Sequence, residues 1–157
     1  MRMHHLVLCL VSPLLSSCTG SSANQTTGTP FVNVPYTVVS QGIQQSIKNQ
    51  QLHVVTDATQ LAALTATAAF IPALPALDLD VNNLVAIFLP PGTGCDALGI
   101  VNVSESADVV LVELEKTVPG DNMPCVALVP NHGPSVLATM PKSGKPVSFA
   151  FTIRKAG

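Results

Sequence analysis

Aromatic side chains are scarce in this 157-residue chain, which has no tryptophan, one tyrosine and five phenylalanines. Proteins that hold single-stranded nucleic acid stack the bases on exposed aromatic rings, and few such platforms can be built here. Positive charge is scarce as well, because the seven lysine and arginine residues are scattered and form no basic stripe. Without such a stripe a surface cannot neutralise the phosphates of a nucleic acid. We therefore predict no binding to nucleic acid.

Charge of either sign is low, since charged residues make up 10% of the chain and hydrophobic residues 47%. This composition is typical of a folded protein rather than a disordered one. The length leaves room for a single domain. A surface with so few charges must be covered by small polar and exposed aliphatic side chains, which favours contact with another protein.

Enzyme motifs are missing too. The chain has no GxSxG elbow and no CxxC pair, and its PPGTGCD stretch lacks the lysine of a phosphate-binding loop. Asp78 and Asp80 lack the spacing of a calcium loop. Glu113 and Glu115 share the exposed face of a predicted strand, which does not indicate a glycosidase pair. We predict no catalytic residues and no cofactor, and we expect that the protein is not an enzyme.

The apolar stretch at the N-terminus is too short to cross a membrane. Leu6–Leu15 has ten residues, and as a helix it would span about half of a bilayer core. Arg2 precedes it and two small serines follow, so residues 1–17 are predicted to be a signal peptide. The run Leu15-Ser16-Ser17-Cys18 resembles the bacterial lipobox. This resemblance implies that Cys18 becomes the first mature residue and carries acyl chains, which anchor the protein to the membrane.

The residues after Cys18 indicate a tether. Removing residues 1–17 removes Arg2, which takes the net charge from −2 to −3. Thr19 follows the cysteine, and the lack of aspartate there resembles outer-membrane sorting in enteric-type bacteria, so the outer membrane is favoured over the inner membrane. Residues 19–30 are mostly small and polar, with a reach of roughly 20 Å. We assign 18–33 to the lipidated cysteine and flexible tether, and 34–157 to the domain.

From about Phe31 onward, apolar stretches of four to eight residues alternate with turn-forming residues, a rhythm typical of β-strands. Leu84–Leu89 has no polar face, which predicts a central strand covered on both sides. Odd-numbered residues from Val147 to Ile153 are apolar and alternate with smaller or polar ones, which predicts one buried face. The predicted strands are Tyr36–Gln41, Gln44–Lys48, Leu52–Val55, Leu84–Leu89, Ala97–Val103, Val109–Thr117, Ser135–Met140 and Pro146–Arg154.

One helix stands out after Asp57, which is a suitable N-cap, with Gln60 three residues later in a capping-box-like arrangement. Leu61, Leu64 and Ala68 fall on one helical face, and the helix should end before Pro72. The sequence therefore predicts an α+β fold, a mostly antiparallel β-sheet domain with one conspicuous α-helix.

The cysteines that remain after cleavage and acylation are Cys95 and Cys125. Two cysteines in an exported chain favour a structural disulfide. The alternative is a nucleophilic or redox cysteine, for which the nearest histidine is His132, seven residues after Cys125, a spacing that forms no motif. A zinc site built from both cysteines with His53 and His132 is the weakest interpretation, because none are paired at ligand spacing. We predict no metal site.

The order of features carries a family resemblance. Gly42 follows the first strand, Leu52–Asp57 leads into the helix, and a loop with proline and aspartate precedes Leu84–Leu89. The chain closes with Gly133–Lys142 and then Pro146–Phe149 and its alternating continuation. This order, over about residues 36–154, resembles the C-terminal domain of the PrcB family, lipoproteins named as accessory subunits of a secreted protease complex. The resemblance implies a β-rich domain at the bacterial surface that binds and stabilises another protein, and it implies no catalytic residues.

Three hypotheses follow from the sequence. The first is a non-catalytic membrane-anchored lipoprotein that binds a protein partner such as a secreted protease. The second is an enzyme whose site is assembled from distant residues, with Cys125 and His132 as the pair to consider. The third is an envelope protein that binds a small ligand in a pocket of the sheet.

Overall fold

The computed structural model describes residues 29–121, 125 and 132–156. These residues form two four-stranded sheets and one helix, so the predicted fold class is confirmed. The strands are β1 (Val32–Asn33), β2 (Thr37–Gln41), β3 (Gln51–Val55), β4 (Asn82–Phe88), β5 (Ala97–Glu105), β6 (Val110–Val118), β7 (Ser135–Pro141) and β8 (Val147–Lys155), and α1 spans Ala58–Ala68.

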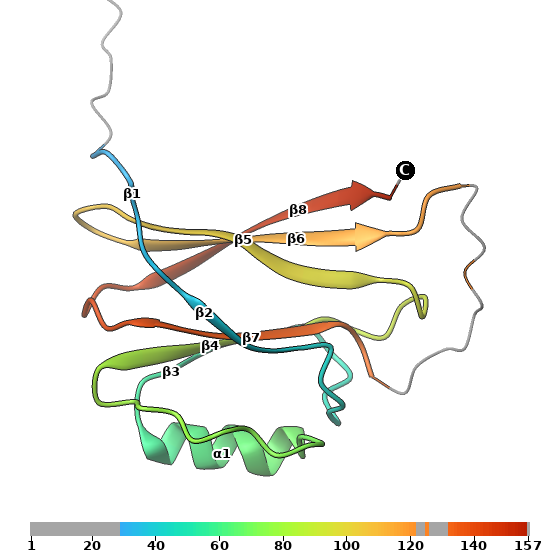
Figure 1. Ribbon diagram of the computed structural model, residues 1–157, viewed down its shortest axis with the longest axis horizontal. Helices are drawn as coiled ribbons and strands as arrows, with labels where there is room; N and C mark the ends of the chain where they lie inside the picture. Colours follow the sequence, from blue (N-terminus) through green and yellow to red (C-terminus); the bar gives the residue numbers. More distant parts are fainter. Residues whose placement is uncertain (1–28, 122–124, 126–131, 157) are drawn as a thin grey trace, which may run out of the picture.

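The two sheets and the helix form three layers (Figure 1). Sheet A has the strand order β1-β5-β6-β8 and sheet B the order β2-β7-β4-β3. All strand pairs are antiparallel except β6 and β8, which run parallel. Between the sheets lies a core to which β4 contributes Val85 and Ile87. A second core between sheet B and α1 receives Leu84, Ala86 and Phe88 from the same strand. The prediction that this stretch is a central strand covered on both sides is therefore confirmed.

The helix begins as the sequence predicts. The Asp57 side chain accepts a hydrogen bond from the backbone N–H of Gln60 at 2.9 Å. The Gln60 side chain in turn accepts one from the backbone N–H of Thr56, also at 2.9 Å. This reciprocal arrangement satisfies backbone donors that a helix start leaves free. The helix ends at Ala68 and is followed by Ala69, whose backbone is in the left-handed region with φ 49°. Leu64 and Ala68 are the buried residues of the helix.

The predicted strand Gln44–Lys48 is wrong. Only Gln44 forms an isolated bridge, and its partner is Ile71. The segment packs beneath the end of α1 instead, since the backbone N–H of Ser46 donates to the carbonyl of Ala68 at 2.7 Å. Ile43 and Ile47 are buried there in the core between sheet B and the helix. The apolar residues that suggested a strand are thus used for packing against a helix rather than for pairing.

The last strand has only part of the predicted buried face. Val147 and Phe149 pack against the core between the sheets. Phe151 and Ile153, on the same face, are 38% and 73% exposed. β8 is an edge strand with β6 on one side and no described strand on the other, and of its residues only Val147 and Phe149 pack against the core.

Candidate functional site

The predicted signal peptide, Cys18 and most of the predicted tether lie outside the described residues. The last two residues assigned to the tether form β1, which pairs with Glu105 and Ser104 at the end of β5. Among the described residues no helix is long and apolar enough to cross a membrane. The lipid anchor therefore stays a prediction from the sequence.

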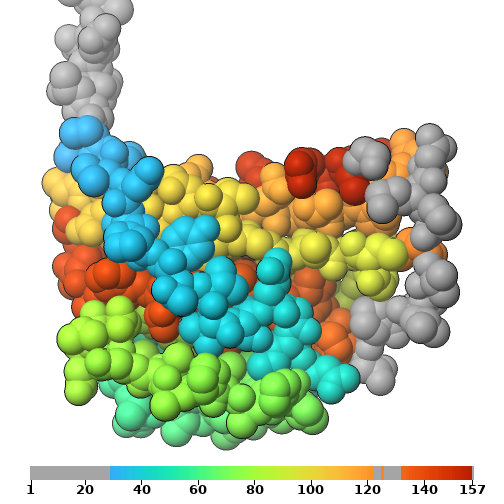
Figure 2. Space-filling model, viewed as in Figure 1, coloured from blue at the N-terminus to red at the C-terminus, as the bar shows by residue number. Residues whose placement is uncertain are grey.

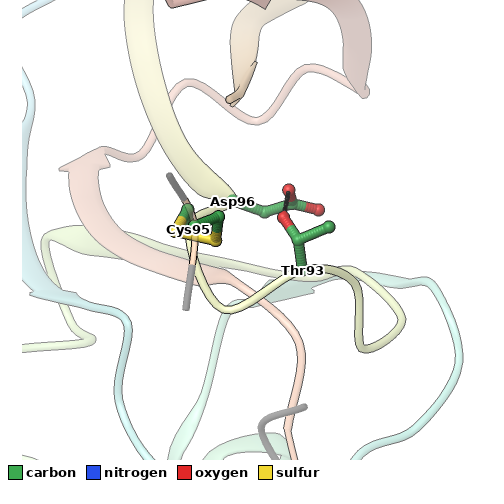
Figure 3. Close-up of a disulfide and its surroundings, with 4 residues drawn as sticks. Thr93, Cys95 and Asp96 are labelled. Carbon is green, nitrogen blue, oxygen red and sulfur yellow. Dashed lines mark hydrogen bonds between the residues drawn. A yellow bond between two sulfur atoms is a disulfide. The ribbon is translucent and has the colours of Figure 1, made fainter. Parts of the chain in front are cut away.

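Cys95 and Cys125 are joined in a disulfide, with their Cα atoms 6.0 Å apart. Figure 3 shows this bridge in the turn that precedes β5, beside Thr93 and Asp96. It ties that turn to the segment between β6 and β7. Because the Cys125 sulfur is bonded, it offers no thiolate for attack, and the pair with His132 cannot act as a nucleophile and base in this state.

The two histidines of the hypothetical zinc site, His53 and His132, line different grooves. His132 lines a groove of about 410 Å³ next to the disulfide, together with Gln41, Thr93 and Asp96. His53 lines another of about 310 Å³ between β3 and α1. Its ring lies 2.8 Å from the Gln51 side-chain oxygen, and burial lowers the pKa of His53, which favours the neutral ring. Across the described ranges, no three histidine, cysteine, aspartate or glutamate side chains are grouped closely enough to hold a metal ion.

Asp96 is the charged centre of the groove beside the disulfide, and the sequence carried no signal for it. Its carboxylate, only 5% exposed, pairs with the Lys116 ammonium at 2.9 Å and accepts a hydrogen bond from the Thr93 hydroxyl. Burial by itself would raise the pKa of Asp96, but the hydrogen bonds from Thr93 and Lys116 and the charge of Lys116 outweigh it and hold the pKa below its usual value. Gly92 makes room for this arrangement, because a Cβ there would lie 2.2 Å from the carboxylate.

Replacing Lys116 with methionine is expected to lower the free energy of unfolding at pH 7 by about 2 kcal/mol, since it leaves a buried carboxylate without its partner. In the unaltered protein the folded-state pKa of Asp96 lies below the unfolded one, so this stabilisation is complete above about pH 4 and is lost as the pH falls through the folded-state pKa. Urea denaturation of both proteins at pH 7 and pH 3 measures the difference. An equal loss of stability at both pH values would contradict the role of the Asp96 charge.

The remaining acidic pairs have structural roles. The Asp78 side chain accepts a hydrogen bond from the backbone N–H of Asp80 at 3.1 Å, which stabilises the turn before β4. Glu113 accepts a hydrogen bond from the Asn102 side chain at 2.8 Å. Glu115 pairs with Arg154 at 3.1 Å. These contacts on neighbouring strands of sheet A are those of a solvated sheet face, as the sequence predicts for the glutamates.

A surface that the sequence did not predict says more about function than these acidic pairs do. Residues 31–41, which we name the crossing segment, run from β1 in sheet A to β2 in sheet B along one side of the sandwich (Figure 1). The Tyr36 hydroxyl donates to the Ile100 carbonyl at 2.9 Å, which fixes the segment beside β5. The crossing segment forms a band across part of the face seen in Figure 2.

Exposed apolar side chains occur along the crossing segment and on the neighbouring strand β5. Phe31 is 51% exposed, and Val32 and Val38 on the crossing segment are exposed as well. Val101, 55% exposed, lies next to Ile100 where the pairing of β5 with β6 shifts register. We name these four residues the crossing surface. None of them is charged, and charged residues are depleted at the centre of protein interfaces, so these side chains are candidates for contact with another protein.

The chain matches no protein-family model, no curated protein and no solved structure. Its resemblance to the PrcB family therefore rests on the order of its elements alone.

Proposed function

We propose that this protein is a non-catalytic lipoprotein of the bacterial cell envelope, anchored through Cys18, that binds and stabilises a protein partner such as a secreted protease. The outer membrane is the favoured location. The observation that supports a protein partner is the crossing surface, formed by Phe31, Val32, Val38 and Val101.

The position of the crossing surface supports this function. It begins at Phe31, directly after the small polar residues 19–30, so a lipid anchor at Cys18 would hold it at a root-mean-square distance of roughly 20 Å from the membrane. A partner bound there would be kept at the membrane together with the domain. The uncharged side chains of the crossing surface suit the centre of a protein interface, where charged residues are depleted.

The function is tested by isolating the tagged full-length chain from membranes in mild detergent and identifying what co-purifies. The double variant Phe31→Ser/Val101→Ser removes two apolar contacts at exposed positions, and we expect it to retain at least about tenfold less partner. Ile71→Ser is the matched control, because Ile71 is also an exposed apolar residue but lies beyond the end of α1. It should retain the partner fully.

The anchor is tested separately with Cys18→Ala, which should move the protein from the membrane fraction to the soluble fraction and leave the crossing surface intact. Equal partner retention by the double variant and the unaltered chain would show that the crossing surface is not the binding site. If no protein co-purifies reproducibly with either the anchored or the Cys18→Ala form, the proposed function is wrong.

A further inference from the structure

The outer edge of β8 is long and unprotected. The strand has nine residues, and its pairing with β6 runs without a bulge from Val147 to Lys155. It contains no proline, and its charges are confined to Arg154 and Lys155 at the end. Natural proteins usually shield edge strands by shortening them or by placing bulges, prolines or charges along them. Among the described residues none pairs with this edge.

Two backbone hydrogen bonds show which groups of β8 face outward. The N–H of Val110 donates to the carbonyl of Pro146 at 3.0 Å, and the N–H of Ala156 donates to the carbonyl of Val118 at 2.8 Å. Even-numbered residues therefore direct their N–H and C=O groups towards β6, since these groups alternate along a strand. The odd-numbered residues from Val147 to Lys155 present theirs at the free edge.

We propose that β8 pairs antiparallel with β8 of a second copy of this chain, about a two-fold axis at Phe151, so that two copies of sheet A form one continuous eight-stranded sheet. Phe151 then lies opposite Phe151 of the second copy, Phe149 opposite Ile153, and Val147 opposite Lys155. This register pairs all nine residues and uses every outward N–H and C=O, about ten hydrogen bonds in all.

The side chains of β8 suit this arrangement. In antiparallel pairing opposite residues share a face, so the exposed rings of Phe151 meet and each Ile153 lies beside a Phe149. Arg154 lies opposite Ser148, which keeps the positive ends of the two strands apart. A parallel pairing in register would place the two Arg154 side chains next to each other, and like charges directly opposite are destabilising.

The topology leaves room for the second copy. β1 lies at the other edge of sheet A from β8 (Figure 1). The chain that precedes β1 in each copy therefore leaves from an outer edge of the eight-stranded sheet and does not enter the pairing. The crossing surface has Val32 on β1 and Val101 on β5, and neither strand neighbours β8, so self-association and partner binding use different residues.

Cysteine cross-linking of co-expressed, differently tagged full-length chains tests both the pairing and its register. In the proposed dimer Ala150 lies opposite Thr152 as a pair without backbone hydrogen bonds, with Cα atoms about 4.5 Å apart, which permits a disulfide. Ala150→Cys in one copy and Thr152→Cys in the other should give a disulfide-linked dimer under mild oxidation. Ser148→Cys with Thr152→Cys, which are out of register, should give at least about tenfold less.

A second change blocks the edge without disturbing the sheet. The N–H of Ile153 faces outward, so Ile153→Pro removes no hydrogen bond to β6, and proline is tolerated on edge strands. Added to the cysteine pair, it should reduce cross-linking at least about tenfold, whereas Val81→Pro, at another exposed apolar position, should not. Unchanged thermal melting shows that the Ile153→Pro chain is folded, and Ile153→Lys offers a second way to block the edge.

The proposal is overturned if folded copies give no Ala150–Thr152 cross-link, or if the out-of-register pair links equally well. Capture of a different protein by the β8 cysteines in place of a second copy would overturn it as well. These outcomes are separate from those of the proposed function, because partner retention through the crossing surface is measured on chains with an unaltered β8.

Discussion

Replacing Phe88 with alanine is expected to lower the free energy of unfolding by about 4 kcal/mol. Phe88 is fully buried at the end of β4, between sheet B and α1. Its ring stacks on Phe70 with centroids 6.0 Å apart, and the His53 ring lies at the same centroid distance in a T-shaped arrangement. Removing the ring leaves a cavity that the two layers cannot close, because β4 is held on both sides by β3 and β7. Urea denaturation at neutral pH measures the loss.

Phe151→Ala is the matched control, since it removes the same ring from an exposed position on β8. Its ring contributes little to either core, and we expect a loss of less than about 1 kcal/mol. A similar loss for both variants would show that the C-terminal half of β8 is as tightly packed as β4.

The contrast between these two phenylalanines shows what the sequence could predict. Leu84–Leu89 has apolar residues at every position, and such a run has to be covered on both faces wherever it lies. The alternation in β8 showed correctly which residues share a face. It could not show whether a second layer reaches Phe151 and Ile153, because that depends on how far sheet B extends beneath sheet A.

Contacts between segments far apart in the sequence were also beyond prediction. Seven of the eight predicted strands are present with ends within two residues, because each has its own apolar pattern and turn residues. Gln44–Lys48 has a similar composition, yet it packs against the end of α1, a contact that no local pattern encodes. The parallel pairing of β6 with β8 joins strands separated by β7 in the sequence, and periodicity alone carries no information on such partners.

The candidate sites were less predictable than the fold. Low charge indicated that apolar side chains would remain exposed, but not which ones: the crossing surface includes Phe31 and Val101, which are 70 positions apart in the sequence. Asp96 could not be recognised from the sequence, because it depends on an ion pair with Lys116 on the neighbouring strand. The disulfide could be predicted, because Cys95 and Cys125 are the two cysteines that remain once Cys9 and Cys18 are assigned to the signal peptide and the lipid anchor.

Removing that disulfide with the double variant Cys95→Ser/Cys125→Ser is expected to lower the free energy of unfolding by about 3 kcal/mol and the melting temperature by about 10 °C. The two cysteines are 30 positions apart, so the bridge closes a long loop and restricts the unfolded chain more than the folded one. It also fixes the turn that carries Thr93 and Asp96. Thermal unfolding followed by circular dichroism measures the change.

Treating the unaltered protein with a reductant should reproduce the melting temperature of the double variant, because both lack the same covalent link. The reductant should have no further effect on the double variant, which controls for any direct action on the fold. If the reduced and unreduced proteins melt at the same temperature, the bridge does not stabilise the domain. A lower melting temperature with unchanged partner retention would separate the bridge's role in stability from the crossing surface, which lies on other residues.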